Sequence, residues 1–398
     1  MNVEKESKQN YACLDLARGL AALAVAASHL RAFVLVDASS VENLSGLWKI
    51  FYLFTGLGHQ AVMVFFVMSG FLVGKHVHQA FGENRWSWTD YAIKRLSRLW
   101  IVLLPALFLT ACWDAIGINI FHASLYQGAF NEAYHSTPKI QDVGHLYSFG
   151  TAIGNAFFLQ TITVPPFGTN GPMWSLSNEF WYYVVFPLCY FVMWKRASIL
   201  SRVGAGCLAL SLCCILPIQL VLYGVIWLFG FGVVLIDAYF TYRVSRRLHR
   251  MLASLVGALF LTTVAGPKLL RIDGAAPDFA CGIAFAGFLY FLTKSHISNR
   301  FISHGAKISS ELSYTLYLTH FSMLALVSCT LLKNVRLQPS SSALTIYIGL
   351  LSVTILYAYS IYCIFERNTK RLQTTLLNRF NSSGRLSANA AGASRFVA

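Results

Sequence analysis

The chain has 398 residues, 56% of them hydrophobic and only 12% charged, whereas about 25% of the residues in an ordinary soluble domain are charged. This composition excludes a water-soluble globular protein, because a soluble core cannot hide so much apolar surface. The formal net charge of +15 suits basic cytoplasmic loops and contact with anionic membrane lipid, and without a DNA- or RNA-reading motif we expect no nucleic acid partner.

The apolar residues fall in blocks of about 18 to 24, the length that an α-helix needs to cross about 30 Å of hydrocarbon. Each block therefore predicts a transmembrane helix. In chain order the predicted spans are 12–36, 59–74, 99–115, 173–194, 199–216, 219–239, 252–266, 276–292, 308–332 and 343–365. We expect an all-α fold, that of a polytopic integral membrane protein with about ten transmembrane helices.

The segment 148–161 is apolar but short, and Pro165 and Pro166 follow it. These features favour a re-entrant or interfacial helix over a further span. With ten spans and the N-terminus inside, most of the 31 lysines and arginines lie in cytoplasmic segments, as the orientation rule requires. Both termini are therefore expected to be cytoplasmic, with the chain in the inner cell membrane; if 148–161 spanned, the topology after it would invert.

The predicted loops are too short to build an independent soluble core, which leaves one membrane domain at 12–371. A cytoplasmic N-terminal segment, 1–11, precedes it, and the first span is too long and too polar for a cleaved signal peptide. The tail, 372–398, is expected to be disordered because its end is rich in Ser, Ala, Asn and Gly. Neither the nine cysteines nor the loop histidines His122, His135 and His145 show the spacing of metal ligands, so no metal is expected.

The first span carries Arg18 and His29 with Asp15 nearby. At 100° per residue, Arg18 and His29 share one helix face, about 16 Å apart along the axis. One interpretation is that Arg18 reaches the cytoplasmic headgroups beside Asp15 and that His29 makes an interhelical hydrogen bond. The other is that a neutral His29 accepts a proton from a hydroxyl or carries an acyl group.

The fourth span carries Glu179, in the segment WSLSNEFWYY. Counting from the middle of each span places Glu179 and His29 both about 6 to 8 Å outside the midplane. This matched depth predicts a shared cavity, in which the carboxylate orients the imidazole or binds sugar hydroxyls. The alternative is a protonated glutamic acid in a helix interface.

Three further positions have two interpretations each. Arg95 and Arg98, one turn apart at the cytoplasmic end of the third span, suit phosphate binding or simply set the orientation. Ser69 precedes Gly70 in mid-span, where small residues are typical of close helix packing. His320, in the ninth span, is expected either to line the cavity or to pack as a polar residue.

Taken in order, these segments resemble those of the membrane acyltransferase-3 family, the O-acetyltransferases of bacterial surface polysaccharides and related acceptors. The marks are Arg18 with His29, FFVMSGFLVG, Arg95 with Arg98, WSLSNEFWYY, and SYTLYLTHF ending in His320. The resemblance extends from about residue 14 to residue 366. It implies an O-acyltransferase that takes an acyl group, usually acetyl, from cytoplasmic acyl-coenzyme A to an acceptor hydroxyl at the outer side.

The resemblance also implies roles for individual residues. His29 would be the catalytic histidine and Arg18 its essential partner, while Arg95 and Arg98 would contact the coenzyme phosphates. Glu179 and His320 would line the acceptor or acyl cavity. The expected partners are acetyl-coenzyme A, as a donor substrate and not a bound cofactor, a carbohydrate or lipid-linked sugar acceptor, and membrane lipid.

Attack on a thioester creates an oxyanion that needs a hydrogen-bond donor. The candidates for this donor, which would also contact the substrate, are Ser69, Trp174, Ser177 and Tyr182. The main rival function is that of a transporter or flippase for an acylated sugar or lipid, which would use the same charges as a translocation pathway; a sensor without chemistry is a third. The sequence predicts neither the acceptor, nor the length of the acyl group, nor the oligomeric state.

Overall fold

The protein is described by a computed structural model, which covers residues 2–128, 143–240, 245–270, 272, 274–295 and 299–380, without the side chains of residues 2–11 and 145. The regular structure in these residues is helical, with two isolated β-bridges and no strand. The α-helices are α1 (Asn2–Val34), α2 (Gly46–Phe54), α3 (Gly58–Gly82), α4 (Trp88–Asn119), α5 (Val143–Leu146), α6 (Phe149–Ala156), α7 (Trp174–Met193), α8 (Ile199–Ile215), α9 (Ile218–Tyr239), α10 (Arg246–Leu270), α11 (Ala275–Thr293), α12 (Arg300–Thr330) and α13 (Ser341–Ile364).

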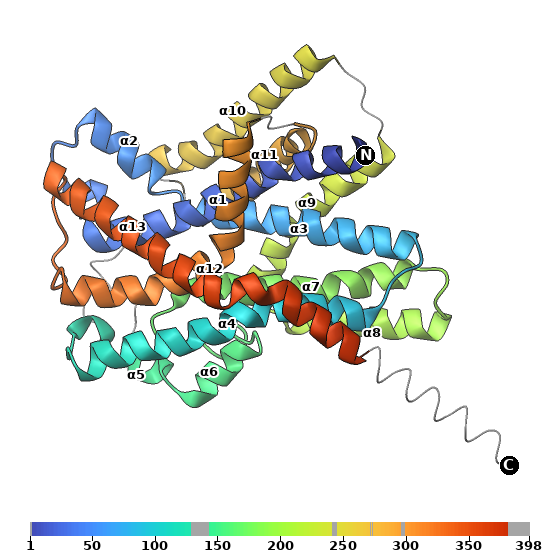
Figure 1. The fold of residues 1–398 in the computed structure, drawn as a ribbon, viewed down its shortest axis with the longest axis horizontal. Helices are drawn as coiled ribbons and strands as arrows, with labels where there is room; N and C mark the ends of the chain where they lie inside the picture. Colours follow the sequence, from blue (N-terminus) through green and yellow to red (C-terminus); the bar gives the residue numbers. More distant parts are fainter. Residues whose placement is uncertain are drawn as a thin grey trace.

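Each predicted span coincides with one helix, so the all-α polytopic fold is confirmed. Within the described residues, 8 helical segments are long and apolar enough to cross a membrane, and α7 and the shorter α8 complete the set. Helices α1, α3, α4, α7 and α8 run close to the long axis of the molecule, and the start of α1 lies at the same end as the end of the helix that reaches Phe380 (Figure 1). This shared end agrees with the prediction that both termini lie on one side.

The segment 148–161 does not cross the molecule. Its helix, α6, has 8 residues, about 12 Å at 1.5 Å per residue, and the chain then folds back among the other helices. Three polar residues in and after α6 are fully buried there: Asn155, Gln160 and Asn170. The even number of spans expected from the charge distribution is therefore preserved.

Polar residues set where several helices begin. The side chains of Ser87, Ser198 and Ser340 accept hydrogen bonds from backbone N–H groups in the first turns of α4, α8 and α13, which satisfies donors that a helix start leaves free. Pro217 lies in the short link between α8 and α9, directly before the first residue of α9, because proline cannot continue a helix but is tolerated where one starts. The sequence thus marks these helix boundaries itself.

The centre of the molecule is the parallel pair α1 and α12, which pack against each other along much of their length. At the middle of α1, Arg18 contacts Ser310 of α12. Beyond the end of both helices, Leu35 and Leu337 form an isolated parallel bridge. The face of α1 that carries Arg18 is therefore the face buried against α12.

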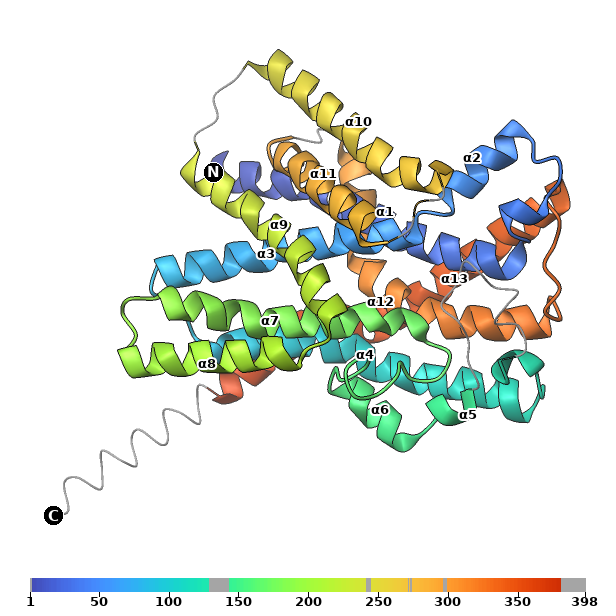
Figure 2. The ribbon, with the colours of Figure 1, turned by 180° about the vertical axis from the view of Figure 1, so that it is seen from behind.

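Helices α3 and α9 form a second close pair, crossing in both views (Figure 1 and Figure 2). A Cβ atom at Gly70 would lie 1.8 Å from the carbonyl oxygen of Trp227, and one at Gly230 would lie 1.9 Å from that of Val67. No side chain fits at either position. The close packing predicted at Ser69 and Gly70 is confirmed.

The two predicted end segments contain more helix than expected. α1 begins at Asn2, so the segment 1–11 continues into the first span. After α13 and a short 3-10 turn, helix resumes over 369–380, and the beginning of the predicted disordered tail, 372–398, is therefore helical. The remaining residues of that tail, 381–398, lie outside the described residues, as does His135.

Candidate functional site

Two cavities lie between the central helices. The first, of about 920 Å³, we call the histidine cavity; it is lined by residues that include Ser28, His29, Arg31, Tyr52, His59, Val62, Trp174, Lys268 and Tyr317. The second, of about 180 Å³, we call the arginine cavity; it is lined by residues that include Arg18, Val62, Ser69, Arg95, Arg98, Ser175, Glu179, Tyr183, Tyr314 and Tyr317. Of the described residues that line these two cavities, Val62 and Tyr317 alone line both, which places them in the wall between the two.

His29 is hydrogen-bonded to His320 of α12, with 2.8 Å between His29 Nδ1 and His320 Nε2. His320 Nδ1 lies 2.8 Å from the carbonyl oxygen of Leu316. A carbonyl oxygen only accepts hydrogen bonds, so His320 Nδ1 carries a proton and, in the neutral ring, His320 Nε2 accepts one. His29 Nδ1 therefore donates, and the lone pair of His29 is left on Nε2.

The fixed proton positions have a chemical consequence. His29 lines the histidine cavity, whereas His320 is completely buried behind it. A neutral imidazole with a lone pair on a fixed nitrogen is able to accept a proton or to attack a carbonyl carbon. The pair thus presents one reactive nitrogen, Nε2 of His29, supported by a second ring that does not reach the cavity.

Arg18 lines the arginine cavity and lies on α1 about three helical turns before His29. Its Nη1 donates to Ser310 Oγ at 3.2 Å, and that hydroxyl donates to Asp15 Oδ1 at 2.8 Å. The predicted pairing of Arg18 with Asp15 is therefore bridged by a hydroxyl of α12. This arrangement fixes the guanidinium in the cavity wall and away from lipid.

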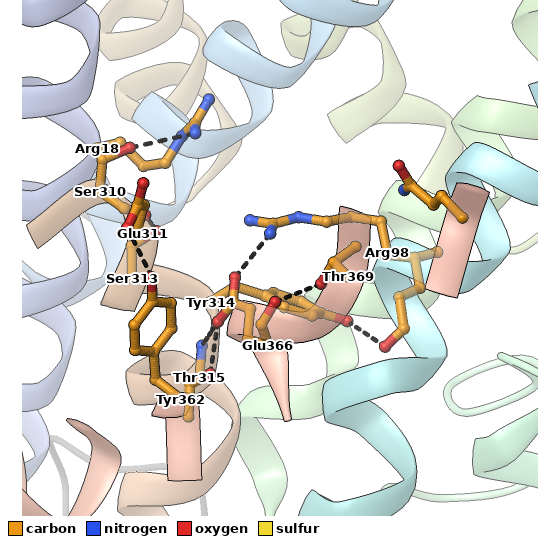
Figure 3. A network of polar contacts seen from close by, with 12 residues as sticks. Arg18, Arg98, Ser310, Glu311, Ser313, Tyr314, Thr315, Tyr362, Glu366 and Thr369 are labelled. Atoms are coloured by element: carbon orange, nitrogen blue, oxygen red, sulfur yellow. Dashed lines mark hydrogen bonds and ion pairs between the residues drawn. The ribbon is translucent and has the colours of Figure 1, made fainter. Parts of the chain in front are cut away.

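Arg98 is held by an ion pair that sequence analysis missed, between its Nη1 and Glu366 Oε1 at 2.7 Å. Glu366 is buried and also accepts hydrogen bonds from Thr315, from the backbone N–H at 3.1 Å and from Oγ1 at 2.5 Å. Figure 3 shows this network, which joins α4, α12 and the turn after α13. Arg98, which lines the arginine cavity, is thus neutralised by Glu366, which does not line it.

Arg95 lies between aromatic rings, 5.4 Å from the ring centre of Tyr91 and 5.2 Å from that of Tyr183. Cation–π contacts of this kind hold a guanidinium without neutralising it. Three arginines and one carboxylate, Glu179, line the small cavity. With Arg98 paired to Glu366, two arginines still face one carboxylate, which suits an anionic ligand.

A family comparison agrees with this architecture. The family model described as "Acyltransferase domain" matches residues 11–363, a range that runs from within α1 to the last turn of α13 and contains the residues that line both cavities. The chain belongs to the acyltransferase-3 family. It is therefore a multi-pass membrane acyltransferase, as the order of its motifs predicts. Neither a curated protein nor a solved structure matches the chain significantly.

Glu179 of this acyltransferase lies elsewhere than expected. It lines the arginine cavity, where its Oε1 accepts hydrogen bonds from Ser69 at 3.1 Å and from Tyr183. The prediction that it shares a cavity with His29 is wrong. The reason is that α7 begins inside the protein, directly after a buried loop that ends at Met173. Counting residues from the end of the apolar run therefore placed Glu179 too near the outer surface.

Three other predicted cavity residues are engaged away from the cavities. His320 binds His29 and lines neither cavity. Ser177 donates its hydroxyl to the carbonyl of Phe158 at 2.8 Å, and Tyr182 donates to the carbonyl of Leu220 at 2.6 Å. The last two are therefore unavailable as oxyanion donors, because their hydrogens are used in packing. Sequence does not reveal such partners, which come from distant segments.

Ser69 and Trp174 remain in cavities, but in different ones. Ser69 faces the arginine cavity and accepts a hydrogen bond from Trp227 Nε1 at 3.1 Å. Trp174 lines the histidine cavity together with His29. Its indole N–H makes no hydrogen bond to any residue that the structure describes, which leaves it available as a donor to an oxyanion in this cavity.

Tyr317 was missed by the sequence analysis, although it lies one turn before His320. Its hydroxyl donates to the carbonyl oxygen of Pro172 at 2.8 Å. Ser175 Oγ lies 2.7 Å from the same hydroxyl and therefore acts as the donor to it. These bonds hold the ring across the boundary between the two cavities. Tyrosine on a long apolar helix carries no sequence signal that distinguishes a wall from ordinary core.

Proposed function

We propose that this acyltransferase transfers an acetyl group from acetyl-coenzyme A to a hydroxyl of a carbohydrate or lipid-linked sugar at the outer face of the inner membrane. The observation that carries the proposal is the free Nε2 of His29. It is the one imidazole nitrogen whose lone pair is fixed by the hydrogen bonds from Leu316 through His320, and it belongs to a residue that lines the larger cavity.

The arginine cavity supports an anionic donor. Arg18, Arg95 and Arg98 line it, and guanidinium groups are well suited to phosphate and thioester oxygens. Its volume of about 180 Å³ is below the range of about 300 to 1,000 Å³ typical of sites for whole small molecules. In the proposal it therefore admits the slender arm and the acyl group of the coenzyme, while the anionic nucleotide stays at its mouth.

The reaction joins the contents of the two cavities. The hydroxyl oxygen of the acceptor forms a bond to the acyl carbon, the C–S bond of the thioester breaks, and its electron pair leaves with sulfur. The hydroxyl proton is lost and the thiolate is protonated, so that ester and thiol are the products. Val62 and Tyr317 separate the cavities, so the acyl group passes this wall in every turnover.

Acyl transfer also needs a donor for the negative charge that develops on the carbonyl oxygen. Trp174 lines the same cavity as His29, and we assign this role to its indole N–H. Removing one such donor from an acyl-transfer site costs about 10²- to 10³-fold in rate. Ser177 and Tyr182, by contrast, have no free hydrogen to offer.

Acyl transfer by the purified protein tests the proposal. The protein is incubated with radiolabelled acetyl-coenzyme A and with the envelope glycan and lipid fraction of a strain that lacks the encoding gene. We expect alkali-labile label in this fraction, and at least about 100-fold less with His29→Ala, because a positioned acid–base group contributes about 10²- to 10⁴-fold.

A monodisperse His29→Ala protein with the thermal stability of the native one serves as the control for folding. Full activity in that variant would exclude His29 as the reacting group. Absence of any transfer by the native protein, with solute movement across vesicles instead, would favour a transporter.

A further inference from the structure

A second histidine faces the histidine cavity, and nothing in the mechanism above uses it. His59 is the second residue of α3, and its Nε2 lies 2.9 Å from both carboxylate oxygens of Asp278, in the first turn of α11. Asp278 Oδ2 also accepts a hydrogen bond from Tyr223 at 3.4 Å. The side chain of His59 is 43% exposed, whereas that of Asp278 is 8% exposed. A buried carboxylate thus holds an imidazole that remains accessible.

The hydrogen bonds fix the protons of His59 as well. A carboxylate only accepts hydrogen bonds, so His59 Nε2 carries the proton and the lone pair of the neutral ring is on Nδ1. A carboxylate behind an imidazole orients the ring and stabilises its protonated form. This is the arrangement of a general base.

His59 and His29 lie on helices that meet beside the cavity. A Cβ atom at Gly58 would lie 2.8 Å from Cβ of Ser28, so the start of α3 lies directly against α1 at the residue before His29. Both histidines line the same cavity. The cavity is therefore lined by two imidazoles from neighbouring helices.

His59 and His29 differ in the residue to which each is hydrogen-bonded. The partner of His59 is the negatively charged carboxylate of Asp278, which accepts from Nε2 and leaves Nδ1 able to take up a proton. The hydrogen-bonding partner of His29 is a neutral imidazole, His320, and it offers no such charge. Chemistry that leaves a proton on the ring therefore suits His59, while chemistry that uses a lone pair to form a bond to carbon suits His29.

We propose that His59, held by Asp278, takes the proton from the acceptor hydroxyl, and that His29 is the acyl carrier. This inference rests on the proposed acyl transfer and divides it into two steps between two sites. It also agrees with the separation of the cavities, since a carrier on His29 allows the donor to leave before the acceptor reacts.

In the first step, His29 Nε2 forms a bond to the acyl carbon, the C–S bond breaks, and the thiolate leaves through the arginine cavity, where water protonates it. The positive charge on the acylated ring is shared through the Nδ1 proton with His320. In the second step, the acceptor hydroxyl gives its proton to His59 Nδ1 and its oxygen bonds to the acyl carbon. The C–N bond breaks, its electron pair returns to His29 Nε2, and His59 then releases its proton to water in the cavity.

Trapping of the labelled protein tests this division. Purified native protein and His59→Gln are mixed with radiolabelled acetyl-coenzyme A without acceptor, then with the envelope fraction of the deletion strain. Glutamine keeps an N–H for Asp278 but cannot accept a proton. We expect both proteins to take up label that hydroxylamine removes, and only the native protein to pass it on rapidly, with transfer by His59→Gln at least about 100-fold slower. His29→Ala should take up none.

Two further variants separate a base from a structural contact. His59→Ala opens space in an accessible part of the cavity, so added imidazole should restore transfer to the acceptor, which a lost packing contact would not allow. His304→Gln, at an exposed histidine of α12 that lines neither cavity, should behave as the native protein does.

The outcomes that overturn the inference differ from those that overturn the function. Native rates of label discharge by His59→Gln would remove His59 from the reaction, and acyl transfer without any labelled intermediate would remove the carrier role of His29. If the native protein used no acetyl-coenzyme A at all, the proposed function itself would fail.

Discussion

Two imidazoles hydrogen-bonded to each other inside a membrane domain control where each other's protons lie. The carbonyl of Leu316 fixes one proton on His320, which in turn fixes one on His29. The lone pair on Nε2 of His29 is thus fixed by the carbonyl oxygen of Leu316 through two successive hydrogen bonds. His320 is accordingly a positioning residue, since it is buried and touches no cavity.

His320→Ala should lower kcat for acyl transfer at least about 100-fold while leaving the KM for acetyl-coenzyme A within about twofold, because His29 would lose its fixed tautomer and orientation but the arginine cavity would be intact. His320→Gln places an amide near the position of His320 Nε2, where its oxygen can accept from His29 Nδ1, and should restore part of kcat. Steady-state kinetics with the envelope fraction as acceptor measure both.

A purely structural role of His320 would give a different result. Both variants would then lose thermal stability, and the glutamine variant would recover no turnover relative to alanine. Equal kcat values for the alanine variant and the native protein would contradict the proton assignment given above.

Sequence reasoning identified the ionisable residues but not all of their partners. Arg18 and His29 were correctly placed on one face of a helix, because the α-helical period determines that relation. The bond between His29 and His320 joins residues 291 positions apart, and such a pairing depends on which helices pack together. The same limitation concealed the partner of Arg98, Glu366, which lies after the last predicted span.

At the scale of helices, the close approach between α3 and α9 determines which residues line the arginine cavity. Gly70 and Gly230 leave no room for a side chain between the helices. This contact brings Trp227 of α9 to Ser69 of α3, whose hydroxyl donates to Glu179 of α7. The packing of two helices through small residues therefore positions a third helix's carboxylate in the arginine cavity.

Gly70→Val should destabilise the protein, because its Cβ would overlap a backbone oxygen of α9 that cannot rotate away. Overpacking of this kind costs about 1 to 3 kcal/mol or more. Thermal unfolding of the purified protein in detergent should show a lower Tm. Gly232→Ala is the matched control on α9, since nothing lies within 4 Å of a Cβ there; an unchanged Tm in Gly70→Val would contradict the close approach.

The helices themselves were largely predictable from the sequence. Apolar runs of sufficient length give helices because unpaired backbone groups are costly in lipid, and each predicted span has a helix. Helix boundaries and depths were less predictable. The loop before α7 is buried through Asn170 and Met173, so Glu179 lies deeper in the protein than its position in the sequence indicates. The helix that reaches Phe380 continues past the apolar run that marked the last predicted span.

Over the whole molecule, the two cavities lie one after the other along the α1–α12 pair. The arginine cavity adjoins Arg18, nearer the start of α1, and the histidine cavity adjoins His29, nearer its end. The start of α1 and the end of the helix that reaches Phe380 lie at one end of the molecule (Figure 1), which the charge distribution predicts to be the cytoplasmic end. The arginine cavity is the nearer of the two cavities to the start of α1. In the proposed function, donor and acceptor therefore approach from opposite sides.

Sealed membrane vesicles test this arrangement most directly. Acetyl-coenzyme A is too highly charged to cross a bilayer, so radiolabelled donor added to inverted vesicles meets only the cytoplasmic face, and donor added to right-side-out vesicles meets only the outer face. We predict labelling of the protein and of envelope acceptors in inverted vesicles, abolished by His29→Ala. Equal labelling of intact right-side-out vesicles would contradict the account.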